Sequence, residues 1–124
     1  MMSTALILFA HGARDPEWAQ PMRHIQSLLK AQQATAEVEL AFLEFMKPTL
    51  AECVAERVLA GTTKICVIPM FIAQGGHLKR ELPEIVDGLR TDYPTVDFVL
   101  TGPIGEQQAV MQAMAETALA LAGL

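Results

Sequence analysis

Two histidines, each placed after an apolar run, are the residues of this sequence best suited to chemistry. His11 directly follows residues 5–10 (ALILFA), and His77 comes shortly after residues 65–68 (ICVI). A neutral imidazole binds borderline divalent cations and accepts a proton near neutral pH. Glu44 lies at the end of another such run, and a carboxylate can bind a metal, orient an imidazole or transfer a proton. These three residues are therefore candidates for an open metal-binding and proton-transferring site.

Basic side chains lie near the same three positions. The chain carries a net charge of −5, yet four of its nine Lys and Arg residues lie in these segments. Together with helix N-termini they could receive an anionic ligand, although acidic residues in the same segments weaken the charge argument. A glycine pair before His77 would serve either a turn or a mobile loop at the mouth of a site. The candidate substrate-binding residues are Arg14, Lys47, Phe71, Gly75, Gly76, Lys79 and Arg80.

Each of these residues also has a simpler explanation. A histidine at a strand end can hydrogen-bond a loop carbonyl, and Glu44 can interact with the dipole of a helix beginning near Pro48. The occurrence of both histidines after strands favours function over two independent structural roles. His24, by contrast, falls within a helical pattern and is expected to be an exposed surface residue.

Apolar patterns predict the elements that position these residues. Short apolar runs predict strands over residues 5–10, 38–45, 65–68 and 96–100. Pro16, the pair Pro48–Thr49 and Gly61 are typical of helix boundaries. Four helical stripes are expected: Trp18, Met22, Ile25, Leu28 and Leu29; Leu50, Val54 and Val58; Leu78, Leu82, Ile85, Val86 and Leu89; and Val110, Met111, Met114, Ala118 and Leu121.

Strict alternation of strand and helix predicts the fold class. We expect a single α/β domain over residues 1–124, with three layers and a four-stranded parallel sheet flanked by helices on both faces. Met111 and Met114 are expected to fill the core. Ligands of such sheets bind beyond the carboxyl ends of the strands, so His11, Glu44 and His77 should share one edge. No GxGxxG or GxxxxGK[ST] motif is present, which weakens a nucleotide-binding interpretation.

Composition excludes several classes of protein. The net negative charge argues against a general nucleic-acid binder. No apolar run approaches the roughly 20 residues that span a bilayer, and the first residues lack the basic region of a secretory signal. Cys53 and Cys66 show no zinc-like spacing and are expected to be packed thiols. The simplest expectation is a soluble cytoplasmic protein that uses no membrane.

Three segments carry a family resemblance over nearly the whole chain. LILFAHGARDP, AFLEFMKPTL and VIPMFIAQGGHLKRELP, in this order and spacing, resemble the small CbiX-type sirohydrochlorin chelatases, which are class II chelatases related to SirB. The resemblance implies a chelatase-like, flavodoxin-like half module. It also implies insertion of Co²⁺ or Fe²⁺ into sirohydrochlorin in cobalamin or siroheme biosynthesis. His11 and His77 match the family's metal-binding histidines and Glu44 its carboxylate.

The resemblance further implies no organic cofactor, with the divalent metal acting as a substrate. Longer relatives contain two such modules, whereas the short form pairs as a homodimer. The sequence departs from the family at Ala13, where Ser is common, at Glu81, where Asp is frequent, and at Gln107 and Gln108, near a usual His-Pro pair. These departures affect expected substrate contacts more than the histidines.

Two other functions remain open from sequence. A non-catalytic carrier of metal or tetrapyrrole would use the same loops. A phosphohistidine enzyme centred on His11 would normally need several arginines, and Arg14 alone fits that chemistry poorly.

Overall fold

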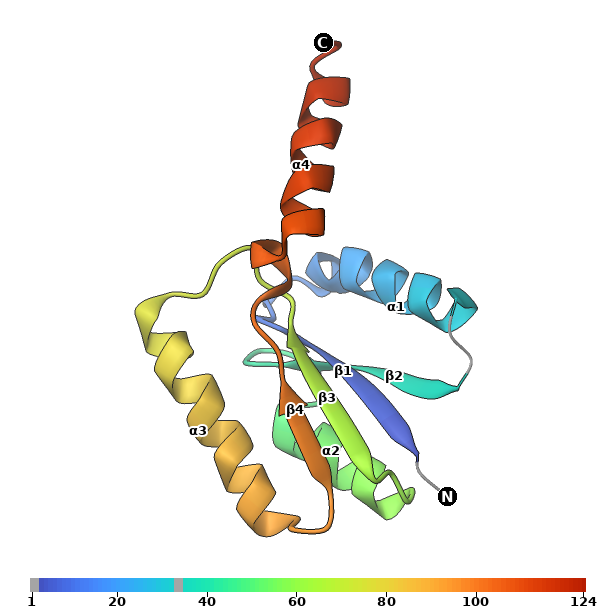
Figure 1. Ribbon diagram of the computed structural model, residues 1–124, viewed down its shortest axis with the longest axis vertical. Helices are drawn as coiled ribbons and strands as arrows, with labels where there is room; N and C mark the ends of the chain where they lie inside the picture. The colour runs from blue at the N-terminus through green and yellow to red at the C-terminus, as the bar shows by residue number, and fades with distance from the viewer. Residues whose placement is uncertain (1–2, 33–34) are drawn as a thin grey trace.

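A four-stranded parallel sheet forms the centre of the protein (Figure 1). The computed structural model describes residues 3–32 and 35–124, so positions 1–2 and 33–34 of the expected 1–124 domain lie outside the described residues. The strands are β1 (Thr4–Ala10), β2 (Ala36–Phe42), β3 (Lys64–Pro69) and β4 (Asp97–Leu100), in the spatial order β2-β1-β3-β4. All neighbouring strands pair in parallel, which confirms the predicted fold class.

Helices follow the strands in the expected alternation. They are α1 (Gln20–Gln32), α2 (Leu50–Leu59), α3 (Gly76–Asp92) and α4 (Gln108–Leu121), with short 3-10 helices η1 (Pro16–Ala19) and η2 (Ile104–Glu106). The parallel strand order places α1 on one face of the sheet and α2 with α3 on the other, as right-handed crossovers require (Figure 1). The prediction of helices on both faces is therefore confirmed.

Two hydrophobic cores lie on the two faces of the sheet. Strand side chains alternate between these faces, so each strand contributes to both layers. The larger core joins β-strand residues to α2 and α3 and includes Ile7, Phe9, Val54, Ile65, Val67, Leu82, Val86 and Phe98. In the smaller core, Leu8, Val38, Leu40 and Phe42 meet Ala19, Met22, Ile25 and Leu29, all from η1 and α1. Two residues of the first predicted helical stripe, Trp18 and Leu28, lie outside this core and are 39% and 46% exposed.

Local sequence explains several element boundaries. Thr49 caps α2 with a reciprocal capping box, in which Thr49 accepts from the Glu52 amide and Glu52 accepts from the Thr49 amide. Gly61 adopts the predicted left-handed conformation after α2, with φ of 92°. Strand β2 ends at Phe42, three residues before the predicted end. The residues 43–45 instead form the turn that carries Glu44.

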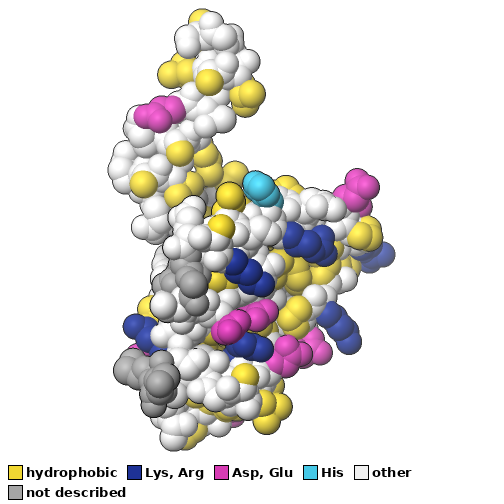
Figure 2. Space-filling view, turned by 90° about the vertical axis from the view of Figure 1, so that its right-hand side faces the viewer, with side chains coloured by type: hydrophobic (Ala, Val, Ile, Leu, Met, Phe, Trp, Pro, Cys, Tyr) yellow, Lys and Arg dark blue, Asp and Glu magenta, His cyan; other side chains and the backbone are white. Residues whose placement is uncertain are grey.

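The last helix departs most from expectation. None of the 14 residues of α4, all within the described part of the chain, is buried, and the helix projects beyond the sheet (Figures 1 and 2). Met111 and Met114 are 45% and 42% exposed, so the prediction that they fill the core is wrong. Helical spacing correctly predicted an apolar face, but such spacing does not specify which surface that face meets.

The two cysteines have different surroundings. Cys53 is buried, and desolvation raises the pKa of its thiol to about 12, which confirms a packed thiol. Cys66 is only half-buried, although burial still raises its pKa. Within the residues that the structure describes, no helix is long and apolar enough to cross a membrane.

Candidate functional site

The loops after β1 and β2 are joined by backbone hydrogen bonds at the carboxyl edge of the sheet. The Leu43 amide donates to the Ala10 carbonyl at 2.9 Å, and the Glu44 amide donates to the His11 carbonyl at 3.1 Å. These bonds continue the strand pairing beyond the ends of β1 and β2. Gly12 makes this approach possible, because its φ is 89° and a Cβ there would overlap the Glu44 carbonyl oxygen. The backbone therefore holds His11 and Glu44 side by side.

His11 and Glu44 form an exposed imidazole–carboxylate pair. The His11 Nδ1 lies 3.7 Å from the Glu44 Oε1 and 3.4 Å from the Gly12 carbonyl oxygen. Their side chains are 53% and 48% exposed, so both can reach a ligand. An imidazole that donates from Nδ1 to the Gly12 carbonyl oxygen, with the Glu44 carboxylate beside it, leaves the Nε2 lone pair free for a cation. The pair can thus bind a metal and accept a proton at one place.

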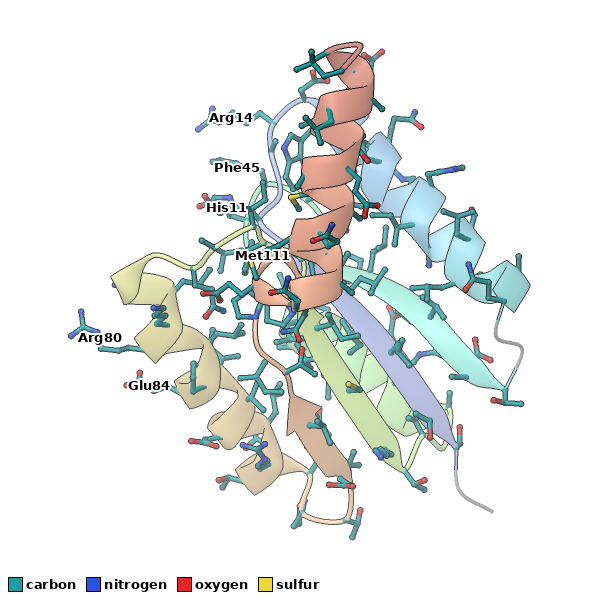
Figure 3. All side chains as sticks on the ribbon, turned by 45° about the horizontal axis from the view of Figure 1, so that its top comes forward. His11, Arg14, Phe45, Arg80, Glu84 and Met111 are labelled. Carbon is teal, nitrogen blue, oxygen red and sulfur yellow. The ribbon has the colours of Figure 1, made fainter. Side chains whose placement is uncertain are left out.

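Arg14 and Phe45 extend this group. The Arg14 guanidinium lies 4.8 Å from the centroid of the Phe45 ring, a cation–π geometry. Figure 3 shows both side chains on the same side of the molecule as His11, to one side of α4. Phe45 is 56% exposed and has a φ of 66°, which is rare for a bulky residue and often marks a functional loop. Sequence reasoning missed Phe45 as a site residue because it looked like the end of a strand.

His77 forms a second imidazole–carboxylate pair near the start of α3. Gly75 is the N-cap residue, and the His77 Nε2 lies 2.9 Å from the Glu81 Oε2, one helical turn later. A neutral His77 that donates Nε2–H to Glu81 keeps its Nδ1 lone pair available. The His77 side chain is 87% exposed. Sequence reasoning noted Glu81 only as a family departure, although the i, i+4 spacing could have identified this pair.

The carboxyl edge therefore carries two separate groups. The structure brings together His11, Arg14, Glu44 and Phe45, whereas His77 and Arg80 share a shallow hollow with Glu81 and Glu84 on α3. In Figure 3, Arg80 and Glu84 extend outward from α3, away from His11. No cluster of three or more His, Cys, Asp or Glu side chains that could hold a metal occurs among residues 3–32 and 35–124. One chain presents two pairs, not one closed centre.

The remaining predicted residues lie on the same edge with varied exposure. Lys47 and Lys79 are exposed, and His24 is exposed on α1 as predicted. The Phe71 ring is half-buried and packs edge-on against Phe9, with centroids 6.1 Å apart. Neither Gly75 nor Gly76 has an atom within 4 Å of an added Cβ, so the backbone at the α3 N-terminus is open to approach.

Another hollow, of about 480 Å³, runs along the β2 edge between α1 and α2. Its lining contains charged side chains of both signs, including Arg23, Glu39 and Glu56. Of the predicted site residues it includes Lys47 alone. Because neither histidine lines it, this hollow is separate from the two imidazole–carboxylate pairs.

An open parallel α/β domain with exposed imidazole–carboxylate pairs at its carboxyl edge defines a class of protein suited to handling a divalent cation. The chain belongs to the CbiX family, whose model matches residues 5–120.

Sequence similarity to two sirohydrochlorin cobaltochelatases supports this family membership. The chain is 31% identical over 108 residues to a sirohydrochlorin cobaltochelatase of Priestia megaterium, covering 87% of this chain but 35% of the relative. It is 30% identical over 112 residues to a sirohydrochlorin cobaltochelatase of Saccharolobus islandicus, covering 85% of both chains. The chain thus spans about a third of one relative and most of the other.

Solved structures show the same fold. A cobalamin biosynthesis CbiX protein of Marinobacter aquaeolei superposes with a TM-score of 0.78 at 26% identity, covering 93% of both chains. SirB of Bacillus subtilis with Fe³⁺ gives a TM-score of 0.80 at 27% identity, covering 97% of this chain and 48% of SirB. SirB of Bacillus subtilis subspecies spizizenii, a sirohydrochlorin chelatase in complex with cobalt, gives 0.78, with 49% of its chain covered.

Proposed function

We propose that this protein is a sirohydrochlorin chelatase that inserts a divalent metal into sirohydrochlorin, on the route to cobalamin or siroheme. The observation that carries the proposal is the exposed His11–Glu44 pair, held at 3.7 Å on the open edge of the sheet. The named relatives support this reaction, and two of them favour Co²⁺. Fe²⁺ is the second metal, since SirB was solved with both iron and cobalt.

The residues at the edge can perform the steps of metal insertion. A hydrated M²⁺ must lose waters, and two pyrrole N–H protons must leave the macrocycle. In the proposed mechanism, the free imidazole nitrogens of His11 and His77 replace water ligands and then yield the metal to macrocycle nitrogens. Glu44 lies within 3.7 Å of His11, so Glu44 and an imidazole that has released the metal can receive the two departing protons and pass them to solvent. Glu81 orients His77 through the 2.9 Å contact.

Basic and apolar side chains at the same edge suit an acidic, planar substrate. Arg14, Lys47, Lys79 and Arg80 would meet its peripheral carboxylates. Phe71 and the open Gly75–Gly76 backbone belong to the loop that would border the macrocycle. The metal is a substrate in this reaction, and the proposed chemistry requires no organic cofactor.

We further propose that the chain acts as a cytoplasmic homodimer, without nucleic-acid or membrane partners. This chain covers about half of SirB, which supports a pairing of two copies to recreate a two-module arrangement. In such a dimer the carboxyl edges of the two sheets would face one another across a cleft. That arrangement would give a macrocycle contacts from both copies.

Metal insertion by the His77→Ala and His11→Ala variants tests the proposed reaction. Each variant should lose about 100-fold or more of the insertion rate, because each removes an imidazole that binds the metal and can accept a departing proton. The rate is followed through the absorbance of sirohydrochlorin with Co²⁺, Fe²⁺ and Ni²⁺ in parallel. His24→Ala is the matched control, since His24 is exposed on α1, and it should retain the wild-type rate.

Near-wild-type insertion by both site variants would refute the assignment of the histidines. A wild-type protein that metallates only one equivalent of tetrapyrrole, without repeated turnover, would refute the enzyme itself and indicate a carrier.

A further inference from the structure

The C-terminal helix presents an apolar face that no other part of the described chain covers. One side of α4 is lined by Ala109, Val110, Ala113, Met114, Thr117, Ala118 and Leu121. Glu116 is the only charged residue in the helix, and Leu121 is 85% exposed. Figure 2 shows hydrophobic atoms along the projecting helix. A face of this kind normally packs against another apolar surface.

A second uncovered surface lies on the sheet, beside α1. Leu6, Cys66 and Val99 pair in register across β1, β3 and β4, and their side chains point to the α1 side of the sheet. These three residues belong to neither hydrophobic core of the described chain, and Val99 is 37% exposed. With the half-buried Ile68, which lies where this surface meets the smaller core, they form what we call the open sheet face. Helix α1 covers the other half of this side, over β2 and β1.

The chain's own α4 is held away from the open sheet face. The Gly105 amide donates to the Phe71 carbonyl at 2.9 Å, and a Cβ at Gly105 would overlap the Ile72 backbone. This contact fixes η2 against the loop after β3, at the carboxyl edge. From there α4 runs outward, beyond the ends of the strands, and does not return over the sheet (Figure 1).

The two uncovered surfaces match in length and direction. A helix of 14 residues is about 21 Å long, and the six residues of β3 extend about 20 Å. If a second copy stood on the carboxyl edge, α4 would enter its sheet from that edge. It would then run antiparallel to the strands, as α1, α2 and α3 do against their own sheet. A hollow of about 340 Å³ beside Ile68 and Thr101 marks the point of entry.

We propose that α4 packs on the open sheet face of a second copy of this chain, and that the exchange is reciprocal. Each copy then gives one helix and receives one, which is a closed two-fold contact. The inference rests on the homodimer of the proposed function and specifies its interface. Helix α4 starts from η2 at the carboxyl edge, so the exchanged helices would also border the two sites.

A charge on either surface tests the exchange. Met114→Glu on α4 and Val99→Glu on the open sheet face should each convert the dimer to a monomer, measured by light scattering during gel filtration. Ala115→Glu is the matched control, because it adds the same charge to α4 outside the apolar face, and it should remain dimeric. Circular dichroism confirms that each variant is folded. A dimer that persists in both folded variants would overturn the proposal.

Cross-linking tests which surfaces meet. A Met114→Cys variant treated with a short bifunctional maleimide should give a product of dimer mass, joined to Cys66 of the second copy. The product should disappear when Cys66→Ser is added, because the buried Cys53, with a pKa of about 12, reacts poorly. A cross-link confined to one chain would overturn the exchange. Neither oligomeric state nor cross-linking depends on turnover. A failure of the proposed helix exchange can therefore be distinguished from a failure of the proposed reaction, which the His77→Ala variant tests.

Discussion

Gly12 is the residue that allows a histidine and a carboxylate to meet at the sheet edge. Its left-handed backbone and its missing side chain let the Glu44 carbonyl approach directly. The Glu44 amide can then donate to the His11 carbonyl at 3.1 Å. The geometry of the proposed site thus depends on a residue that has no chemistry of its own.

Gly12→Ala should therefore separate His11 from Glu44. The added methyl group overlaps a backbone oxygen and strains the left-handed conformation, so we expect a loss of about 1–3 kcal/mol of stability. We also expect a fall in metal-insertion rate beyond what global unfolding explains. Urea unfolding and the insertion assay measure the two effects on one sample.

Gly75→Ala is a suitable control for that variant, because nothing lies within 4 Å of a Cβ there and its φ is −70°. It should remain close to wild type in stability. Equal losses of stability in the two variants would show that the Gly12 contact has no special role.

At the residue scale, the sequence predicted that His11, Glu44, His77 and Arg14 lie at the carboxyl edge, but it indicated neither Phe45 nor the pairing of His77 with Glu81. His11, Glu44 and His77 could be predicted because parallel topology sends the residues after each strand to one edge. Phe45 could not, since its exposure follows from the early end of β2 and a left-handed turn. The separation of His77 from His11 was also not predictable, because it depends on where α3 begins relative to the sheet.

At the element scale, the capping box of α2 anchors the loop that carries Glu44. Thr49 and Glu52 bond each other's backbone amides at 3.2 and 2.9 Å, directly after Pro48. These backbone and side-chain hydrogen bonds lower the pKa of Glu52 below its ordinary value. The ionised carboxylate is thus preferred in the folded state, which couples the start of α2 to pH.

Glu52→Gln should consequently destabilise the protein in a pH-dependent way. A folded-state pKa below the unfolded one gives stability that is present above the unfolded value, 4.5, and lost as pH falls through the folded value. The difference in unfolding free energy between wild type and variant should therefore shrink from neutral pH to about pH 3. Urea unfolding across this range measures it.

Glu56→Gln, one turn further along α2 and outside the capping box, is the comparison. A difference for Glu52→Gln that stays constant with pH would show that the carboxylate charge does not contribute to the cap.

The sequence predicted the helices better than it predicted the surfaces against which they pack. The stripes of α2 and α3 bury Leu50, Val54, Leu82, Val86 and Leu89 as expected, because a sheet face adjoins each helix. The same spacing correctly predicted that α4 is a helix, but the prediction that its methionines pack in the core of the chain was wrong. Its position depends on the close contact of Gly105 with Ile72, which joins segments 33 positions apart and leaves no local pattern.

At the scale of the whole molecule, residues 3–32 and 35–124 present two separate imidazole–carboxylate pairs and two uncovered apolar surfaces. Because of the first feature, the groups of the proposed metal transfer lie in two places. One is the pair of loops that follow β1 and β2, and the other is the start of α3. The second feature gives a physical reason for two copies to associate with their carboxyl edges facing each other. The proposed dimer would cover the apolar surfaces. It would also place groups from two chains around each site.

Insertion activity per chain should therefore depend on protein concentration. If the working site needs both copies, dilution below the dimer dissociation constant should lower the rate per chain, and the melting temperature should fall with it. Ala115→Glu should follow the same curve as wild type, whereas Met114→Glu should be weakly active at all concentrations. A rate per chain that stays constant while light scattering reports dissociation would mean that one edge suffices, with the partner contributing only stability. A parallel fall of rate and dimer fraction would instead place the metal transfer in the space between the two edges, where a flat macrocycle can be held from both sides.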